Sequence, residues 1–72
     1  MLENAQVGQK AVRKMRNGKG ETWQFDAEVI SISSDYVTVL VFADQPRTMF
    51  FDTRTGVNNH GEEYGWLELI PA

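Results

Sequence analysis

Apolar and polar residues alternate along residues 22–52 in a way that predicts consecutive β-strands. In the segment 23–29 every odd position is apolar and every even position is polar. At Ile30 and Ile32 the apolar residues continue at even positions instead. Because a strand turns successive side chains to opposite faces, this change of phase predicts a β-bulge or a sharp bend at Val29 and Ile30.

The same patterning gives five strands in all, joined by short turns and by one long loop. The strongest turn signal is the Asn-Gly-Lys-Gly stretch at residues 17–20, because Asn and Gly tolerate positive φ. No segment longer than one turn carries apolar residues at helical spacing. We therefore expect a loop over 53–65 and strands over residues 9–16, 21–33, 36–42, 47–52 and 66–70.

The second hairpin has a register that the side chains favour. A two-residue turn at 34–35 matches apolar with apolar and polar with polar positions. The predicted cross-strand pairs are Ile32 with Val37, Ile30 with Val39, and Ser31 with Thr38.

The first hairpin leaves two registers open. A two-residue loop would bury Val12 against Phe25 and face Lys14 to Trp23. We favour a three-residue loop at 18–20, although it sets Arg13 beside Phe25. It pairs Met15 with Trp23, Ala11 with Ala27, and Lys10 with Glu28 as an ion pair.

Five short strands with tight hairpins in a chain of this length predict an all-β, five-stranded antiparallel SH3-like small barrel, with an OB-fold barrel as the alternative. The pattern Val7-Gly8-x-x-Ala11-Val12 precedes a Gly-rich turn, and Ala27-x-Val29-x-x-Ile32 then leads into the β-rich segment 36–42. This order resembles the start of KOW-type and Tudor-type SH3-like barrels. The resemblance covers roughly the first 42 residues and implies the fold.

Length and composition narrow the classes of protein. A chain of 72 residues makes one domain at most, and we expect residues 1–8 to form an N-terminal tail and 9–72 the barrel. No cysteine is present, so neither a disulfide nor a thiolate metal site can form. No apolar run approaches the roughly 18–20 residues of a membrane span, and the start lacks the pattern of a signal peptide. We expect a cytoplasmic protein that does not bind a membrane.

Charge is divided unevenly along the chain. Residues 1–20 hold five Lys or Arg and one Glu, whereas residues 21–72 hold two Arg and nine carboxylates. The basic residues of the first hairpin and one tryptophan could hold a phosphate backbone and stack a base, which makes nucleic-acid binding the alternative function. The residues of this set are Lys10, Lys14, Arg16, Lys19 and Trp23.

The loop 53–65 is the region on which we base the main functional prediction. Long loops in compact domains are often functional, and Arg, Tyr and Trp are enriched at binding hot spots. We expect a protein partner to contact this loop, with Asp52, Glu62 and Glu63 favouring a basic partner. Trp66 also fits a core position, because large aromatic side chains dominate small cores. The predicted contact residues are Arg54, Asn58, Asn59, His60, Tyr64 and Trp66.

A run of three large apolar residues, 49–51, points to self-association. One face of a strand takes Phe50 and the other takes Met49 and Phe51. We expect Met49 and Phe51 to form a homodimer seam, unless a bulge or the Met1-Leu2 tail covers them.

Enzymatic signals are weak. His60 is the single histidine, and with Glu62 and Glu63 it makes at most half a metal site. No arrangement of nucleophile, base and orienting group stands out, so we predict no catalytic residue, no metal and no cofactor. The sequence thus predicts a non-enzymatic binding module, as an accessory or inhibitor protein of the kind that phages or mobile elements encode.

Overall fold

The computed structural model describes residues 1–71 and is built almost wholly from β-strands. Short turns join the first four of the five antiparallel strands, and a longer loop that contains the one 3-10 helix of residues 1–71 joins the fourth strand to the last. The elements are β1 (Lys10–Arg16), β2 (Thr22–Ile32), β3 (Tyr36–Val41), β4 (Arg47–Asp52), η1 (Glu62–Tyr64) and β5 (Trp66–Leu69). These bounds match the predicted strands closely. None of the helical structure in residues 1–71 is long and apolar enough to cross a bilayer.

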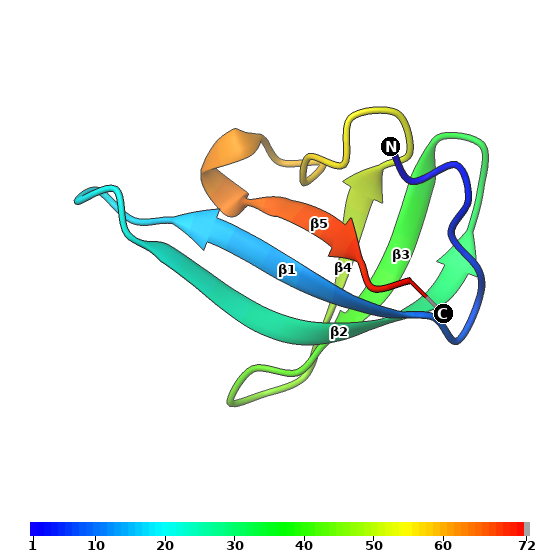
Figure 1. Ribbon diagram of the computed structural model, residues 1–72, viewed down its shortest axis with the longest axis horizontal. Coiled ribbons are helices and arrows are strands. Elements are labelled where there is room, and N and C mark those ends of the chain that lie inside the picture. The colour runs from blue at the N-terminus through cyan, green and yellow to red at the C-terminus, as the bar shows by residue number, and fades with distance from the viewer. Residues whose placement is uncertain (72) are drawn as a thin grey trace.

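The strands form one sheet in the order β4-β3-β2-β1-β5, so that β4 and β5 are its two edges. The long, bent β2 carries the sheet from β1 to β3, as Figure 1 shows. The edges do not pair with each other, so the sheet is all-β and antiparallel but is not closed into a barrel. Within residues 1–71 the segment 56–59 links the two edges, through isolated bridges from Asn58 to Phe51 and from Val57 to Trp66.

The register of the first hairpin is the predicted one with a three-residue loop. Met15 lies opposite Trp23 and Arg13 lies opposite Phe25. The Lys10 ammonium contacts the Glu28 carboxylate at 2.7 Å, which confirms the predicted ion pair.

The phase change in β2 is a β-bulge, as predicted. The register with β3 shifts between Val29 and Ser31, and Val29 rather than Ile30 lies opposite Val39. The predicted pair of Ile30 with Val39 is therefore wrong, because the bulge leaves Ile30 without a partner across the strands. The two pairs beyond the bulge, Ile32 with Val37 and Ser31 with Thr38, are confirmed.

One face of the sheet, here called the inner face, carries the core. Alternate residues of β3 point to it, and Val37, Val39 and Val41 are all buried. The core cluster comprises Leu2, Ala11, Ala27, Val29, Val37, Val39, Val41, Phe51 and Leu67. The opposite side is called the outer face below.

The N-terminal segment is part of this core and not a free tail. Leu2 is only 2% exposed, and its amide donates to the Thr53 carbonyl at 2.8 Å. Further along, the Gly8 amide donates to the Val29 carbonyl. The expected tail over residues 1–8 is thus corrected: buried apolar contact and backbone hydrogen bonds hold it against the sheet.

The apolar run in β4 is sorted by the alternation of the strand. Phe51 is fully buried in the core and Met49 packs against it, whereas Phe50 is 43% exposed on the outer face. Phe51 therefore cannot form the predicted homodimer seam with Met49. Leu2 lies in the same core cluster as Phe51, in agreement with the alternative that the Met1-Leu2 segment covers this run. Phe50 is the residue of this run that a second copy could reach.

Candidate functional site

The loop 53–65 is ordered by hydrogen bonds that side chains accept from its backbone amides. The Asp52 side chain accepts from the amides of Arg54 and Thr55, at 2.7 and 3.1 Å, and these bonds hold the pKa of its carboxyl below the ordinary value. Asp52 thus caps the loop, which leaves it poorly placed to select a basic partner. The Asn58 side chain is buried and accepts from the His60 amide at 2.9 Å. Asn58 therefore helps to hold the loop, and it also lines the hollow described next.

The other predicted contact residues fall on separate surfaces. Asn59, His60 and Tyr64 line one hollow, where the His60 and Tyr64 rings pack edge to face at 5.8 Å. Arg54 is exposed but lies away from that hollow, and its carbonyl accepts from the amino group of Met1 at 3.1 Å.

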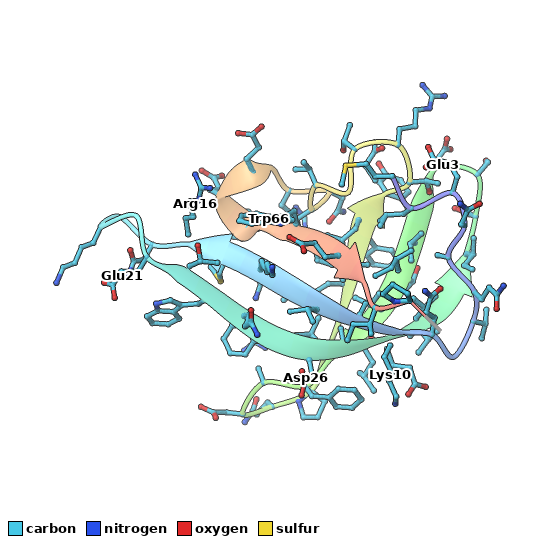
Figure 2. The ribbon with its side chains drawn as sticks, viewed as in Figure 1. Glu3, Lys10, Arg16, Glu21, Asp26 and Trp66 are labelled. Atoms are coloured by element: carbon cyan, nitrogen blue, oxygen red, sulfur yellow. The ribbon has the colours of Figure 1, made fainter. Side chains whose placement is uncertain are left out.

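Trp66 lies on the outer face and is not part of the core, so the core position expected for it is wrong. It is half-buried opposite Lys14, and the neighbouring Leu67 fills the core instead. The Arg16 guanidinium lies over the Trp66 ring at 5.8 Å (Figure 2). The Trp66 indole N–H donates to Glu68 at 2.9 Å, and this bond is the largest cause that lowers the pKa of that carboxyl. Trp66 and Arg16 both line a hollow of about 370 Å³.

The predicted nucleic-acid set is divided between the two faces of β1 and β2. Lys10 and Lys14 lie on the outer face, and each is paired with a carboxylate: Glu28 in one case and Glu68, at 3.1 Å, in the other. Lys19 sits at the hairpin turn, where its amide donates to the Asn17 side chain. Trp23 projects from the opposite, inner face, because it pairs with Met15. These residues therefore do not form one basic surface.

Instead, Trp23 and Tyr64 come together across a groove on the inner face, which we call the aromatic groove. Trp23 is 54% exposed and Tyr64 is 48% exposed, and both border a volume of about 640 Å³. The lining residues come from β1, β2, β3, β4, the turn 43–45 and η1: Arg13, Trp23, Phe25, Val41, Ala43, Asp44, Gln45, Arg47, Met49 and Tyr64.

The groove is open beside the start of β4. The two edge strands of the sheet are instead linked near the end of β4 and the start of β5. The segment 56–59 joins β4 to β5, with the Asp52 amide donating to Val57 and the Leu67 amide to Gly56, both at 2.8 Å. Arg47 and Met49, at the start of β4, lie beyond this junction and border the groove.

Gly65 sets the position of Tyr64. Its φ is +96°, and an added Cβ would lie 2.1 Å from the backbone oxygen of Lys14, so only glycine lets η1 approach β1 this closely. The close approach brings the Tyr64 carbonyl to Arg13, whose Nη2 and Nε donate to it at 2.7 and 3.2 Å.

Arg13 is the charged residue at the base of the groove. It is 8% exposed and points to the inner face between Ala11 and Met15, with its guanidinium 6.0 Å from the centre of the Phe25 ring. Burial lowers the pKa of the guanidinium, which nevertheless stays protonated at neutral pH. Within residues 1–71 no carboxylate forms an ion pair with it.

Arg13, Phe25 and Arg47 line the groove but were not among the site residues expected from the sequence. A signal for Arg13 was present, because the favoured register set it in the inward phase of β1 beside Phe25. An arginine at a core-facing position of a small sheet is unusual, since charged residues are almost never fully buried unless paired. Arg47 carried no comparable signal, because its place depends on how far β4 lies from η1.

The charged side chains that line the groove are Arg13, Arg47 and Asp44. Arginine cannot act as a proton donor or acceptor at neutral pH, and His60 packs on Tyr64 with no carboxylate bonded to its ring among the described residues. Across residues 1–71, no three His, Asp or Glu side chains lie together in a way that could hold a metal ion.

Comparisons with protein-family models, with curated protein sequences and with solved structures gave no match to this chain.

Proposed function

We propose that this protein is a non-enzymatic binding module that holds a segment of a partner protein in the aromatic groove. The observation that carries the proposal is the meeting of Trp23, Phe25 and Tyr64 along one groove, two of them about half exposed. Rigid aromatic side chains provide large contact area at low entropic cost and dominate binding hot spots. A protein partner is also what the loop 53–65 led us to expect. The proposed contact surface now includes Trp23 as well as Tyr64 of that loop.

The geometry around the groove supports a peptide-like occupant. The groove is framed by backbone that strands and η1 hold in place, so little ordering is needed on binding. Met49 adds an adaptable apolar wall that can accommodate different side chains. A partner segment would therefore lay apolar side chains between Trp23 and Tyr64.

The finer fold assignment is part of the same proposal. We infer that the curled sheet is an incompletely closed SH3-like barrel, of the KOW or Tudor type that the first 42 residues resemble. The strand order and the 3-10 turn before β5 support this assignment, as does the link through 56–59 between the two edges.

The proposal is tested by selecting peptides from a random display library on the unmutated protein. Affinity of the selected peptide is then measured by calorimetry for three variants: Trp23→Ala, Tyr64→Ala and Trp66→Ala. We expect about a tenfold loss or more for the first two, as for hot-spot aromatics, and less than about a threefold change for the third. Trp66→Ala is the matched control, because it removes the other tryptophan from the outer face.

Two results would overturn the proposal. One is that no peptide is enriched over repeated selections. The other is that a single-stranded oligonucleotide binds in a manner that depends on Trp23 and weakens steeply with salt, which would move the function to nucleic acid.

A further inference from the structure

We propose that the aromatic groove selects a peptide segment carrying a carboxylate, which Arg13 and Arg47 bind beside the aromatic anchors. This inference rests on the proposed function and names the chemistry of the partner. It differs from the basic partner that the acidic residues of the loop suggested.

The first step concerns the charge of Arg13. A buried charge is costly unless it is paired, and breaking a buried pair leaves a strongly unfavourable lone charge. Arg13 has the Tyr64 carbonyl and the face of Phe25 as partners, but within residues 1–71 it has no anion. By contrast, Lys10 and Lys14 on the outer face of the same strand each have a carboxylate.

The second step concerns the donors that Arg13 leaves open. Its Nε and Nη2 are bound to Tyr64, whereas Nη1 makes no hydrogen bond to residues 1–71. Yet no buried side-chain nitrogen or oxygen in that range lacks a partner. Nη1 is therefore accessible, and Arg13 lines both the aromatic groove and the adjoining hollow with His60.

The third step concerns the other charges of the groove. Arg47 is exposed at the start of β4 and lines both the aromatic groove and the adjoining hollow with His60. Asp44 is the single carboxylate in the lining, and it forms no ion pair with either arginine. The groove is thus locally positive in a chain of net charge −3, and guanidinium groups match a carboxylate in shape and charge.

The charged residues that line the groove favour a carboxylate on a peptide over a nucleic-acid strand. A phosphate backbone needs a continuous track of cations, whereas this groove offers two arginines, no lysine and one opposing Asp44. The lysines of β1 are already paired on the other face. One anionic group beside one or two apolar side chains is the occupant that fits.

A pair of short blocked peptides tests the inference. Side chains two residues apart in an extended chain lie on one face, about 6.6 Å apart, which suits an aromatic anchor next to a carboxylate. The probes are acetyl-Gly-Phe-Ser-Glu-Gly-amide and the same peptide with Gln in place of Glu, titrated into ¹⁵N-labelled protein and followed by NMR. We expect the Glu peptide to bind about five- to tenfold more tightly, with shifts at the Trp23 indole and the Tyr64 amide.

The role of Arg47 is then tested with two variants at exposed arginines, where substitution should leave the fold intact. Arg47→Gln is expected to remove most of the difference between the two peptides. Arg54→Gln makes the same change of charge on an exposed arginine outside the groove, so it controls for net charge and is expected to preserve the difference.

The outcomes separate the two proposals. If both peptides shift the groove residues with equal affinity, or if Arg47→Gln and Arg54→Gln behave alike, carboxylate selection is wrong while the binding groove stands. If neither these probes nor display-selected peptides shift the groove, both proposals fail. Groove shifts caused only by an oligonucleotide such as hexathymidylate would also overturn both.

Discussion

Both faces of β1 carry basic residues, but they differ in burial and in whether a carboxylate pairs with them. On the outer face, Lys10 and Lys14 are balanced by Glu28 and Glu68 and lie in contact with solvent. On the inner face, Arg13 is buried, bound to a carbonyl and without an anion among residues 1–71. A cluster of basic residues in a sequence therefore does not mark a basic surface. The charge that the rest of the chain leaves uncompensated is the better guide to a site.

The largest expected difference between the faces is in β4. Phe51→Ala should reduce the free energy of unfolding by about 3–5 kcal/mol, because a fully buried ring leaves a cavity in the core. Phe50→Ala should cost about 1 kcal/mol or less, since its ring is 43% exposed on the outer face. Urea denaturation of both variants measures the difference. Equal losses would show that the inner and outer faces are wrongly assigned.

The next effect concerns the close approach that brings Tyr64 to Arg13. Gly65→Ala should destabilise the protein by about 2–4 kcal/mol, because the added Cβ meets the Lys14 backbone oxygen and φ is positive. Gly18→Ala is the matched control, as an added Cβ there meets no atom within 4 Å. The control should change stability by about 0.5 kcal/mol at most. Thermal unfolding distinguishes the two, and a stable Gly65→Ala variant would contradict the placement of η1.

A smaller loss of stability is expected from substitutions on the two faces of β1. Arg13→Ala should cost about 1–3 kcal/mol, because the Tyr64 carbonyl loses its donors and Phe25 loses packing. Lys14→Ala removes an exposed ion pair and should cost about 1 kcal/mol at most. Equilibrium denaturation of the two variants gives both values. The account is wrong on this point if Lys14→Ala is the more damaging change.

The smallest effect is a pH dependence on the outer face. The pKa of Glu68 is lowered by its bonds to Trp66 and Lys14, so its ionised form favours the folded state. This contribution is present at neutral pH and is lost as pH falls through the folded-state pKa, below the ordinary glutamate value of about 4.3. It should amount to less than about 1 kcal/mol, because the group is well exposed. In Glu68→Gln, the acid limb of stability against pH should be flatter than in the unmutated protein.

Local patterning predicted the elements well because residues 23–29 have a clear period of two and turn residues separate the first four strands. The first hairpin register, the bulge at Val29 and the bounds of β4 all follow from the alternation of side chains and from turn residues. The pair of Ile30 with Val39 failed because periodicity locates a bulge without saying which residue is left out.

The site was less predictable because it depends on contacts between distant segments. Trp23 and Tyr64 are about 40 positions apart, and they meet only because Gly65 lets η1 pack against β1. From the sequence, Trp23 was expected in a nucleic-acid site and Tyr64 in a protein-binding site. In the same way, no local pattern shows that Leu2 returns to bond with Thr53 and complete the core.

The most direct test of the aromatic groove uses the two tryptophans as reporters on opposite faces. In a ¹⁵N spectrum each gives one indole signal, and both are followed as a display-selected peptide is added. The account predicts that the Trp23 signal moves in step with binding while the Trp66 signal stays in place. Movement of Trp66 with a stationary Trp23 would place the binding surface on the outer face and contradict the account.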